Sequence, residues 1–354
     1  MPRRITVPRR APPAKPNPDN DLPTTSRAGS DGEVDIRELD VSDPAARRAW
    51  YDVQEASARA DRPHALLQAF DAFEVSATRP GAYVDRLRLE ARDGDLLVGV
   101  ADLELPLTEN LDVAWAEVNV LPAHRRKGTG RSLWEAVVDR ARAAGRTRVG
   151  GEVSVDLEVS GAGAAFATAM GAVEKHREDH LLAELPVPTV PIAADYELIA
   201  WRGRCPDEHR ADYLAMRNQM NADIPTGDLD LEATVLDDAR LATSEQRLGA
   251  SYDVRVAAAR HRPDGVFGGY SLLFVPHGAD HGWQDDTLVM PEHRGHRLGA
   301  ALKAANYADL PAHVRLVHTW TAPSNTAMHH TNTALGFRVV EHMYEMEASI
   351  DTNR

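Results

Sequence analysis

The stretch PAHRRKGTG begins at Pro122, and the similar stretch PEHRGHRLG begins at Pro291. Their first residues are 291 − 122 = 169 positions apart, and the same offset relates Arg125 to Arg294. Domains commonly contain about 100–200 residues, so a repeat at this distance is typical of a duplicated domain. The chain of 354 residues is therefore expected to contain two copies of one fold.

The strands and helices predicted around the two stretches occur in the same order in each half of the chain. In the first pass, alternating or apolar runs predict strands at 34–41, 95–105, 113–120 and 148–155 and a helix at 44–60. In the second pass, similar runs predict strands at 196–203, 252–260, 266–275 and 314–320 and a helix at 207–220. The predicted fold class is mixed α/β (α+β), with two tandem domains, each a mostly antiparallel central sheet flanked by helices.

Proline-rich segments indicate where these domains begin and end. Residues 1–32 are crowded with proline and arginine, which predicts a disordered arm. The segment PVPTVPIAAD, beginning at Pro186, predicts a linker over residues 186–194. The N-terminal domain is then expected at 33–185 and the C-terminal domain at 195–350.

Composition narrows the classes of partner and compartment. The formal net charge of −14 argues against a general nucleic-acid binder, which usually carries a basic stripe, and fits a neutral or cationic small partner. The single cysteine, Cys205, excludes an intrachain disulfide and suggests a reducing compartment. We find neither a secretory signal nor an apolar run of about 18 residues, so we predict a cytoplasmic protein that does not enter a membrane.

The repeated stretch lies between a predicted strand and the first turn of a predicted amphipathic helix. Backbone N–H groups at such a helix start lack intrahelical partners, and the helix dipole favours negative charge there. Glycines allow close approach of the backbone, and Arg125 and Arg294 add donors suited to phosphate oxygens. We therefore predict a diphosphate as the ligand of each loop.

Both copies resemble motif A of the Gcn5-related N-acetyltransferase (GNAT) superfamily, V-x-P-x-x-R-x-x-G-x-G/A. In the first copy the pattern falls on Val120, Pro122, Arg125, Gly128 and Gly130. The segment SNTAMHHTNTALGF, which ends at Phe337, resembles motif B of the same family. The resemblance covers roughly residues 34–350, implies a tandem member, and implies acetyl-CoA as the ligand of each loop.

The resemblance also implies which residues contact acetyl-CoA. The pyrophosphate is expected on the loop N–H groups and the pantetheine arm along the strand before each loop. The residues implied are Val120, Arg125, Arg126, Lys127, Gly128, Thr129 and Gly130 in the first half, and Val289, Arg294, Gly295, His296, Arg297, Leu298, Gly299, Ala300, Asn325 and Asn332 in the second.

Each half departs from the family pattern in its own way. Arg297 replaces the middle glycine of the second loop, where its side chain could itself reach phosphate. In the first half, SGAGAAFATAMGA ends in Gly171-Ala172 where the family usually has Gly-Phe, so motif B is eroded. Because the second half keeps both motifs, the C-terminal domain is expected to be the catalytic one.

Acetyl transfer to an amine needs a base, a donor for the oxyanion and an acid for the leaving thiolate. Glu117 and Asp286 occupy equivalent positions of the two repeats, eight residues before the motif arginine. They are the candidate catalytic residues. Either is a general base, an ammonium-orienting group, or a solvent-facing strand carboxylate. The family's tyrosine acid is replaced by Ala167 and by Asn332, which leaves unassisted departure of the thiolate or another acid such as Tyr307, Tyr344 or His329.

These observations predict an N-acetyltransferase that moves an acetyl group from acetyl-CoA, as co-substrate, to a primary amine of a small and possibly cationic molecule. The acidic segment 223–238 supports a cationic acceptor, although a solvated acidic loop is the alternative. No histidine spacing typical of a metal site recurs, so no metal is expected. The alternative function is a catalytically silent acetyl-CoA sensor or scaffold. The acceptor, the length of the acyl group and the oligomeric state are left open.

Overall fold

The structure is a computed structural model that describes residues 34–159 and 161–351. These residues belong to a single compact unit that begins at Val34. The arm predicted over residues 1–32 lies outside the described residues.

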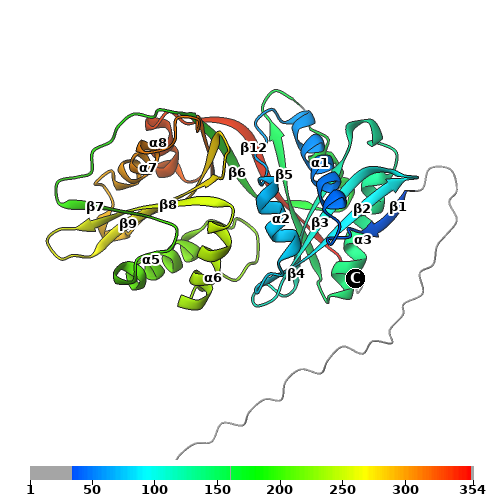
Figure 1. Ribbon diagram of the computed structural model, residues 1–354, viewed down its shortest axis with the longest axis horizontal. Helices are drawn as coiled ribbons and strands as arrows, with labels where there is room; N and C mark the ends of the chain where they lie inside the picture. The colour runs from blue at the N-terminus through cyan, green and yellow to red at the C-terminus, as the bar shows by residue number, and fades with distance from the viewer. Residues whose placement is uncertain (1–33, 160, 352–354) are drawn as a thin grey trace, which may run out of the picture. The chain divides into compact units, whose positions relative to one another are not determined.

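The first half of the chain forms four helices and six strands within the described residues (Figure 1). Helix α1 begins after Asp43, whose side chain accepts a hydrogen bond from the backbone N–H of Ala45, and Pro44 occupies its first turn. The elements are β1 (Asp35–Glu38), α1 (Pro44–Asp61), α2 (Phe70–Thr78), β2 (Val84–Asp93), β3 (Leu96–Pro106), β4 (Val113–Val120), α3 (Thr129–Ala143), β5 (Arg148–Asp156), α4 (Gly163–Ala169) and β6 (Val173–Glu184).

The second half repeats this order. Helix α6 begins after Asp237, whose side chain accepts from the backbone N–H of Arg240. The elements are β7 (Tyr196–Arg202), α5 (Arg210–Asp223), α6 (Asp238–Gly249), β8 (Tyr252–His261), β9 (Phe267–Pro276), β10 (His281–Val289), α7 (Leu298–Ala308), β11 (Leu316–Thr321), α8 (Thr326–Ala334) and β12 (Arg338–Ser349). The mixed, mostly antiparallel fold expected from the sequence is confirmed.

The strands of both halves join in one sheet with the order β1-β2-β3-β4-β5-β12-β6-β11-β10-β9-β8-β7. Strand β12, drawn in red in Figure 1, lies between β5 and β6 of the first half. Strand β6 in turn pairs with β11 of the second half. The two halves thus exchange their last strands, and we retain the division into domains at 33–185 and 195–350 as a proposal about the repeat.

Helices cover both faces of this sheet. On one face, α3 packs on Leu89 and Leu103, and α7 packs on Ala257 and Leu273. On the other face, Trp50 of α1 packs against Phe73 of α2 and against Val100, while α5 and α6 cover the second half. We call the first the loop face, because both repeated loops lead into its helices, and the second the α1 face.

A buried polar chain joins the halves beside the exchanged strands. The Arg62 guanidinium lies 2.9 Å from Glu341, whose carboxylate is hydrogen-bonded at 2.9 Å to Nδ1 of His180. Nε2 of His180 is hydrogen-bonded at 2.9 Å to Nδ1 of His318. Burial alone would raise the pKa of Glu341, but the bonds from His180 and Arg62 outweigh it and hold that pKa at about 2. The carboxylate therefore remains charged between the two halves.

Candidate active site

The two repeated loops adopt the same backbone with different residues. Arg126 and Gly128 have positive φ angles of 62° and 94° in the first loop. Gly295 and Arg297, 169 residues later, have φ angles of 88° and 59°. Each loop therefore has a glycine at one left-handed position and an arginine at the other. A left-handed conformation costs a non-glycine residue about 1–2 kcal/mol, so the retained shape suggests a ligand-binding purpose.

The motif arginines fasten these loops to the rest of the fold. Arg125 donates from Nε to the carbonyl of Val120 at 3.0 Å and forms an ion pair with Asp61 at the end of α1. Arg294 repeats the arrangement, donating to the carbonyl of Val289 at 3.2 Å and lying 3.9 Å from Asp223 at the end of α5. Arg125 thus positions its loop, whereas the side chain of Arg294 is 61% exposed. The expected contact of either arginine with phosphate stays a prediction.

The first loop nevertheless has the features of an anion site. No side chain caps α3, so the N–H groups of its first turn are free to meet a ligand. Arg126 and Lys127 are exposed, and the described residues offer neither of them an ion-pair partner. Thr129 is buried beside Gly99, and the Cβ position of Gly130 lies 3.2 Å from the ring of Phe166. These residues fit a diphosphate.

The second loop differs in its surroundings. No side chain caps α7 either, and Gly295, His296 and Arg297 are exposed. Its His293 is hydrogen-bonded at 2.9 Å to the hydroxyl of Tyr196, and the ring of His296 lies 5.4 Å from the same tyrosine. The predicted contacts Leu298, Gly299 and Ala300 are buried in the first turn of α7.

Beside each loop, two parallel strands separate. Strands β4 and β5 pair only from Val113 to Trp115, although β4 continues to Val120 and β5 to Asp156. Strands β10 and β11 likewise pair only from His281 to Trp283. Backbone groups facing such a gap have no strand partner, so each gap can receive an extended ligand that pairs with the strand edges.

Side chains of the second half occupy the region around its gap. Thr319 donates to the carbonyl of Gln284 at 3.0 Å, directly beyond the last strand pair. Lys303, which is 1% exposed, donates from Nζ to Oδ1 of Asn332 at 2.6 Å, and Asn332 donates to the hydroxyl of Thr321 at 3.0 Å. Burial lowers the pKa of Lys303 to about 7.

The predicted asparagine contacts are therefore engaged within the protein. Both ends of the Asn332 side chain are bonded as described above, and the residue is fully buried. Asn325 caps α8, since its Oδ1 accepts from the backbone N–H of Met328 at 3.1 Å. Asn332 thus has both ends of its side chain engaged, whereas Asn325 is only partly buried and uses only its Oδ1 in the cap.

Glu117 lies on β4, two residues beyond the last pair with β5. Its carboxylate accepts from Nε2 of Gln54 on α1 at 3.0 Å and from Nδ2 of Asn119 at 2.7 Å. The side chain keeps exposed surface, yet the protein around it restricts hydration and, with repulsion from Asp102, raises its pKa. A carboxylate with these properties can orient an ammonium group and accept its proton.

Asp286, its counterpart in the second half, is held differently. It is 9% exposed, accepts from the hydroxyl of Tyr270 at 2.7 Å and forms an ion pair with Nε of Arg217 at 3.2 Å. The neighbouring Asp285 is half-buried, and burial together with repulsion from Asp286 raises its pKa to about 7. Because Arg217 and Tyr270 already contact the buried Asp286 carboxylate, it is less accessible to an acceptor amine than Glu117 is.

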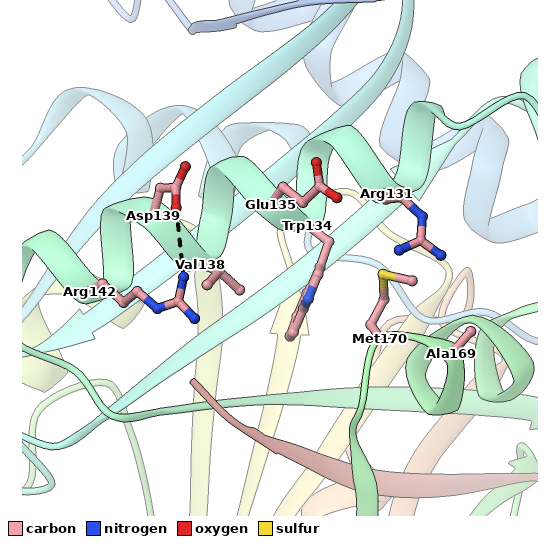
Figure 2. Close-up of a pocket in the computed structure, with 8 residues that line it drawn as sticks. All are labelled: Arg131, Trp134, Glu135, Val138, Asp139, Arg142, Ala169 and Met170. Atoms are coloured by element: carbon pink, nitrogen blue, oxygen red, sulfur yellow. Dashed lines mark ion pairs between the residues drawn. The ribbon is translucent and has the colours of Figure 1, made fainter. Parts of the chain in front are cut away.

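Two cavities lie beside the helices, one next to α3 and the other next to α6. One, of about 280 Å³, lies beside α3 and the end of α4 and is lined by Arg131, Trp134 and Met170, among others (Figure 2). The other, of about 870 Å³, lies between the α2–β2 region and α6. Its lining includes Arg86 and Arg240, which are paired with Glu104 and Glu109. Only the second volume falls in the range of about 300–1,000 Å³ usual for ligand pockets.

The acidic segment 223–238 of the second half packs on the first half. The backbone N–H of Asp228 donates to the carbonyl of Lys175 at 2.8 Å, and Arg148 donates to the carbonyl of Asp230 at 2.9 Å. Gly227 has a φ of 58° and lies against His176. The segment thus lies beside the exchanged strands rather than over the gap between β10 and β11.

Residues 34–159 and 161–351 contain no group of three or more His, Cys, Asp or Glu side chains placed to hold a metal ion. In the same part of the chain, no helix combines the length and the apolar character needed to cross a membrane.

Comparisons with known proteins agree with this geometry. The sequence model of the acetyltransferase (GNAT) family matches residues 47–167, and a search of curated proteins returned no match. A tandem GNAT protein from the clavulanic acid biosynthesis pathway, solved without AcCoA, is 28% identical, with a TM-score of 0.76 and coverage of 91% of this chain and 100% of that one.

Two more distant structures share the fold. A GCN5-related N-acetyltransferase from Sphaerobacter thermophilus is 17% identical, with a TM-score of 0.65 and coverage of 91% of this chain and 97% of that one. A GNAT-family acetyltransferase from Colwellia psychrerythraea is 12% identical, with a TM-score of 0.53 and coverage of 89% and 100%. Residues 47–167 are therefore a GNAT acetyltransferase domain, and the fold of the described chain is that of a tandem GNAT protein.

Proposed function

We propose that the chain is an acetyl-CoA-dependent N-acetyltransferase that acts on a primary amine of a small, cationic molecule, and that its N-terminal half carries out the reaction. Acetyl transfer from acetyl-CoA is the activity of the family whose model matches residues 47–167. We assign the reaction to the N-terminal half because the two equivalent carboxylates differ in exposure and in their partners. Glu117 is exposed with a raised pKa, whereas Asp286 is buried against Arg217.

Other observations support the same half, although the sequence alone favoured the C-terminal one for its intact motif B. The family model falls on residues 47–167. Arg126 and Lys127 are exposed beside the first loop, and the second gap is bordered by the bonded Lys303–Asn332 pair. We infer that the second half mainly completes the sheet and the acceptor cleft.

The chemistry follows from these placements. The free N–H groups at the start of α3 hold the diphosphate, and the thioester lies in the gap between β4 and β5. Glu117, directly or through a water molecule, takes a proton from the ammonium, and the neutral nitrogen attacks the thioester carbonyl. Backbone N–H groups of β4 that face the gap stabilise the oxyanion. The C–S bond then breaks, the nitrogen loses its second proton, and the thiolate leaves as the free thiol.

The test is the release of CoA thiol from acetyl-CoA in the presence of a panel of primary amines. Glu117→Gln should lower kcat by about 100-fold or more, the usual effect of removing a general base. Asp286→Asn should change kcat by less than tenfold, and its stability should be measured alongside because Arg217 would lose its partner. Loss of turnover in a well-folded Asp286→Asn protein, with normal turnover in Glu117→Gln, would move the reaction to the second half. Binding of acetyl-CoA without thiol release from any amine would favour the silent sensor instead.

A further inference from the structure

A row of carboxylates crosses the α1 face at the exchanged strands. Glu345 of β12 is directly opposite Glu152 of β5, and on its other side it is opposite His176 of β6. Glu178 of β6 is opposite Met343, two residues from Glu345 on the same face. Since Trp115 is opposite Gly150, Glu117 and Glu152 also project to one face, two residues further along β4 and β5. We call Glu152, Glu178 and Glu345 the junction carboxylates.

This arrangement is costly for the folded protein. Like charges directly opposite each other on neighbouring strands destabilise a sheet. Burial, with repulsion among the junction carboxylates, raises the pKa values of Glu178 and Glu345 to about 7. The pKa of Glu152 is also raised, by burial and by repulsion from Glu117 and Glu104.

The acids that flank this row along β12 have cationic partners, and the junction carboxylates do not. Glu347, the next residue of β12 on this face, pairs with Arg148 at 2.7 Å, and Glu341 pairs with Arg62 at 2.9 Å. Among the described residues, no arginine or lysine forms an ion pair with any of the junction carboxylates. The fold therefore supplies counter-ions on both sides of the row and leaves its centre without one.

A second, independent feature points into the same place. The side chain of His176 is 9% exposed, and its Nε2 is buried without a hydrogen-bond partner, 3.9 Å from Oε1 of Glu178. Burial lowers the pKa of His176, so the ring is neutral and cannot serve as the counter-ion. Gly227 and Asp228 of the acidic segment close over this histidine. Buried polar atoms normally have a hydrogen-bond partner, so an unpartnered one beside unpaired acids indicates a ligand-binding site.

We propose that the junction carboxylates are a second ammonium site, so that the acceptor is a diamine or polyamine with one nitrogen at Glu117 and another at Glu345 and Glu178. This inference rests on the proposed function of the N-terminal half. Paired strands are about 4.8 Å apart, and β4 and β5 have already separated at Glu117, so Glu345 lies at least about 10 Å from Glu117 across the sheet and Glu178 at least about 14 Å. The two charges of the acceptor should be separated by a similar distance.

The experiment compares α,ω-diaminoalkanes with monoamines of the same length, using the full chain, acetyl-CoA and thiol release. For the wild type, kcat/KM for 1,8-diaminooctane should exceed that for 1-aminooctane by about tenfold or more, and 1,4-diaminobutane should show less advantage over 1-aminobutane. The advantage should shrink in 1 M salt, where the Debye length falls to about 3 Å. Glu345→Gln combined with Glu178→Gln should bring the diamine-to-monoamine ratio close to one.

Two controls keep the outcomes separate. Glu184→Gln, on the exposed end of β6, should keep the wild-type ratio. Calorimetric binding of 1,8-diaminooctane in the absence of acetyl-CoA gives a readout besides turnover, and this binding should weaken about tenfold in the double variant. Acetylation of monoamines without a diamine advantage, or an advantage that survives in the double variant, overturns the second ammonium site alone. Absence of acetylation of every amine, with diamine binding intact, overturns the proposed function and leaves the ammonium site standing.

Discussion

Glu345→Gln should make the protein more stable at alkaline pH and leave its stability at acidic pH nearly unchanged. In the folded protein, burial and the neighbouring Glu152 and Glu178 raise the pKa of Glu345 from 4.5 to about 7. In the unfolded chain the same carboxyl ionises near its ordinary pKa. Holding the ionised form in the sheet therefore costs free energy at every pH above that ordinary value.

The size of the effect follows from the two acid constants. Each tenfold change in an acid constant is worth about 1.4 kcal/mol, so a rise of the pKa from 4.5 to about 7 sets a ceiling of about 3.5 kcal/mol. Glu345 is only half-buried and its neighbours can relieve the repulsion by binding a proton, which reduces the expected gain to about 1–2 kcal/mol. The gain should be fully present at pH 8, should fall as the pH drops through 7, and should vanish near pH 4.

Urea unfolding followed by circular dichroism at pH 8 and pH 4.5 measures this difference. Glu347→Gln is the matched control, because Glu347 lies on the same strand and face but pairs with Arg148 at 2.7 Å. That variant should lose stability at pH 8, since Arg148 loses the buried one of its two carboxylate partners and keeps only Asp112. A Glu345→Gln protein that is no more stable than the wild type at pH 8, or that gains equally at both pH values, would refute the reasoning.

Three further outcomes are expected. Arg126→Ala should weaken acetyl-CoA binding in calorimetry by about 1.5–3 kcal/mol, the range for a charge-assisted hydrogen bond, and unchanged affinity would remove this side chain from the cofactor site. A double-mutant cycle on Arg125 and Asp61, measured by urea unfolding, should give a coupling energy of about 1 kcal/mol, whereas independent effects would contradict their role in fastening the loop. Asn332→Leu should destabilise the protein by about 1–3 kcal/mol at pH 7 because buried Lys303 loses its acceptor, and a stability equal to the wild type would show that the lysine finds another partner.

Local sequence patterns were sufficient to predict the helices, strands and loops that the two halves share. The run 113–120 predicted β4 with its observed bounds, and the periodic segment 44–60 predicted α1 to within one residue. The glycine-rich stretches at Pro122 and Pro291 identified both helix-start loops, and with them the family. These features depend on residues close together in the chain, which is why hydrophobic period, capping and glycine placement reveal them.

The exchange of β6 and β12 was not predictable from such patterns. Glu345 and Glu152 are 193 residues apart in sequence (345 − 152), and only the register of β12 against β5 brings them opposite each other. Either residue alone resembles any polar strand position. Neither Glu152 nor Glu178 was singled out from the sequence, although Glu117 was.

The sequence by itself determined the GNAT fold, its duplication and the position of the two loops, because each of these is encoded in contiguous segments. Only the tertiary structure distinguishes the two candidate carboxylates, since Glu117 and Asp286 occupy equivalent positions of the repeat and differ in what packs around them. Glu117 remains exposed beside Gln54 and Asn119, whereas Asp286 is buried, paired with Arg217 and hydrogen-bonded to Tyr270. The proton affinity of a carboxyl depends on burial and on neighbouring charge, and both are set by residues that the chain brings together only when it folds.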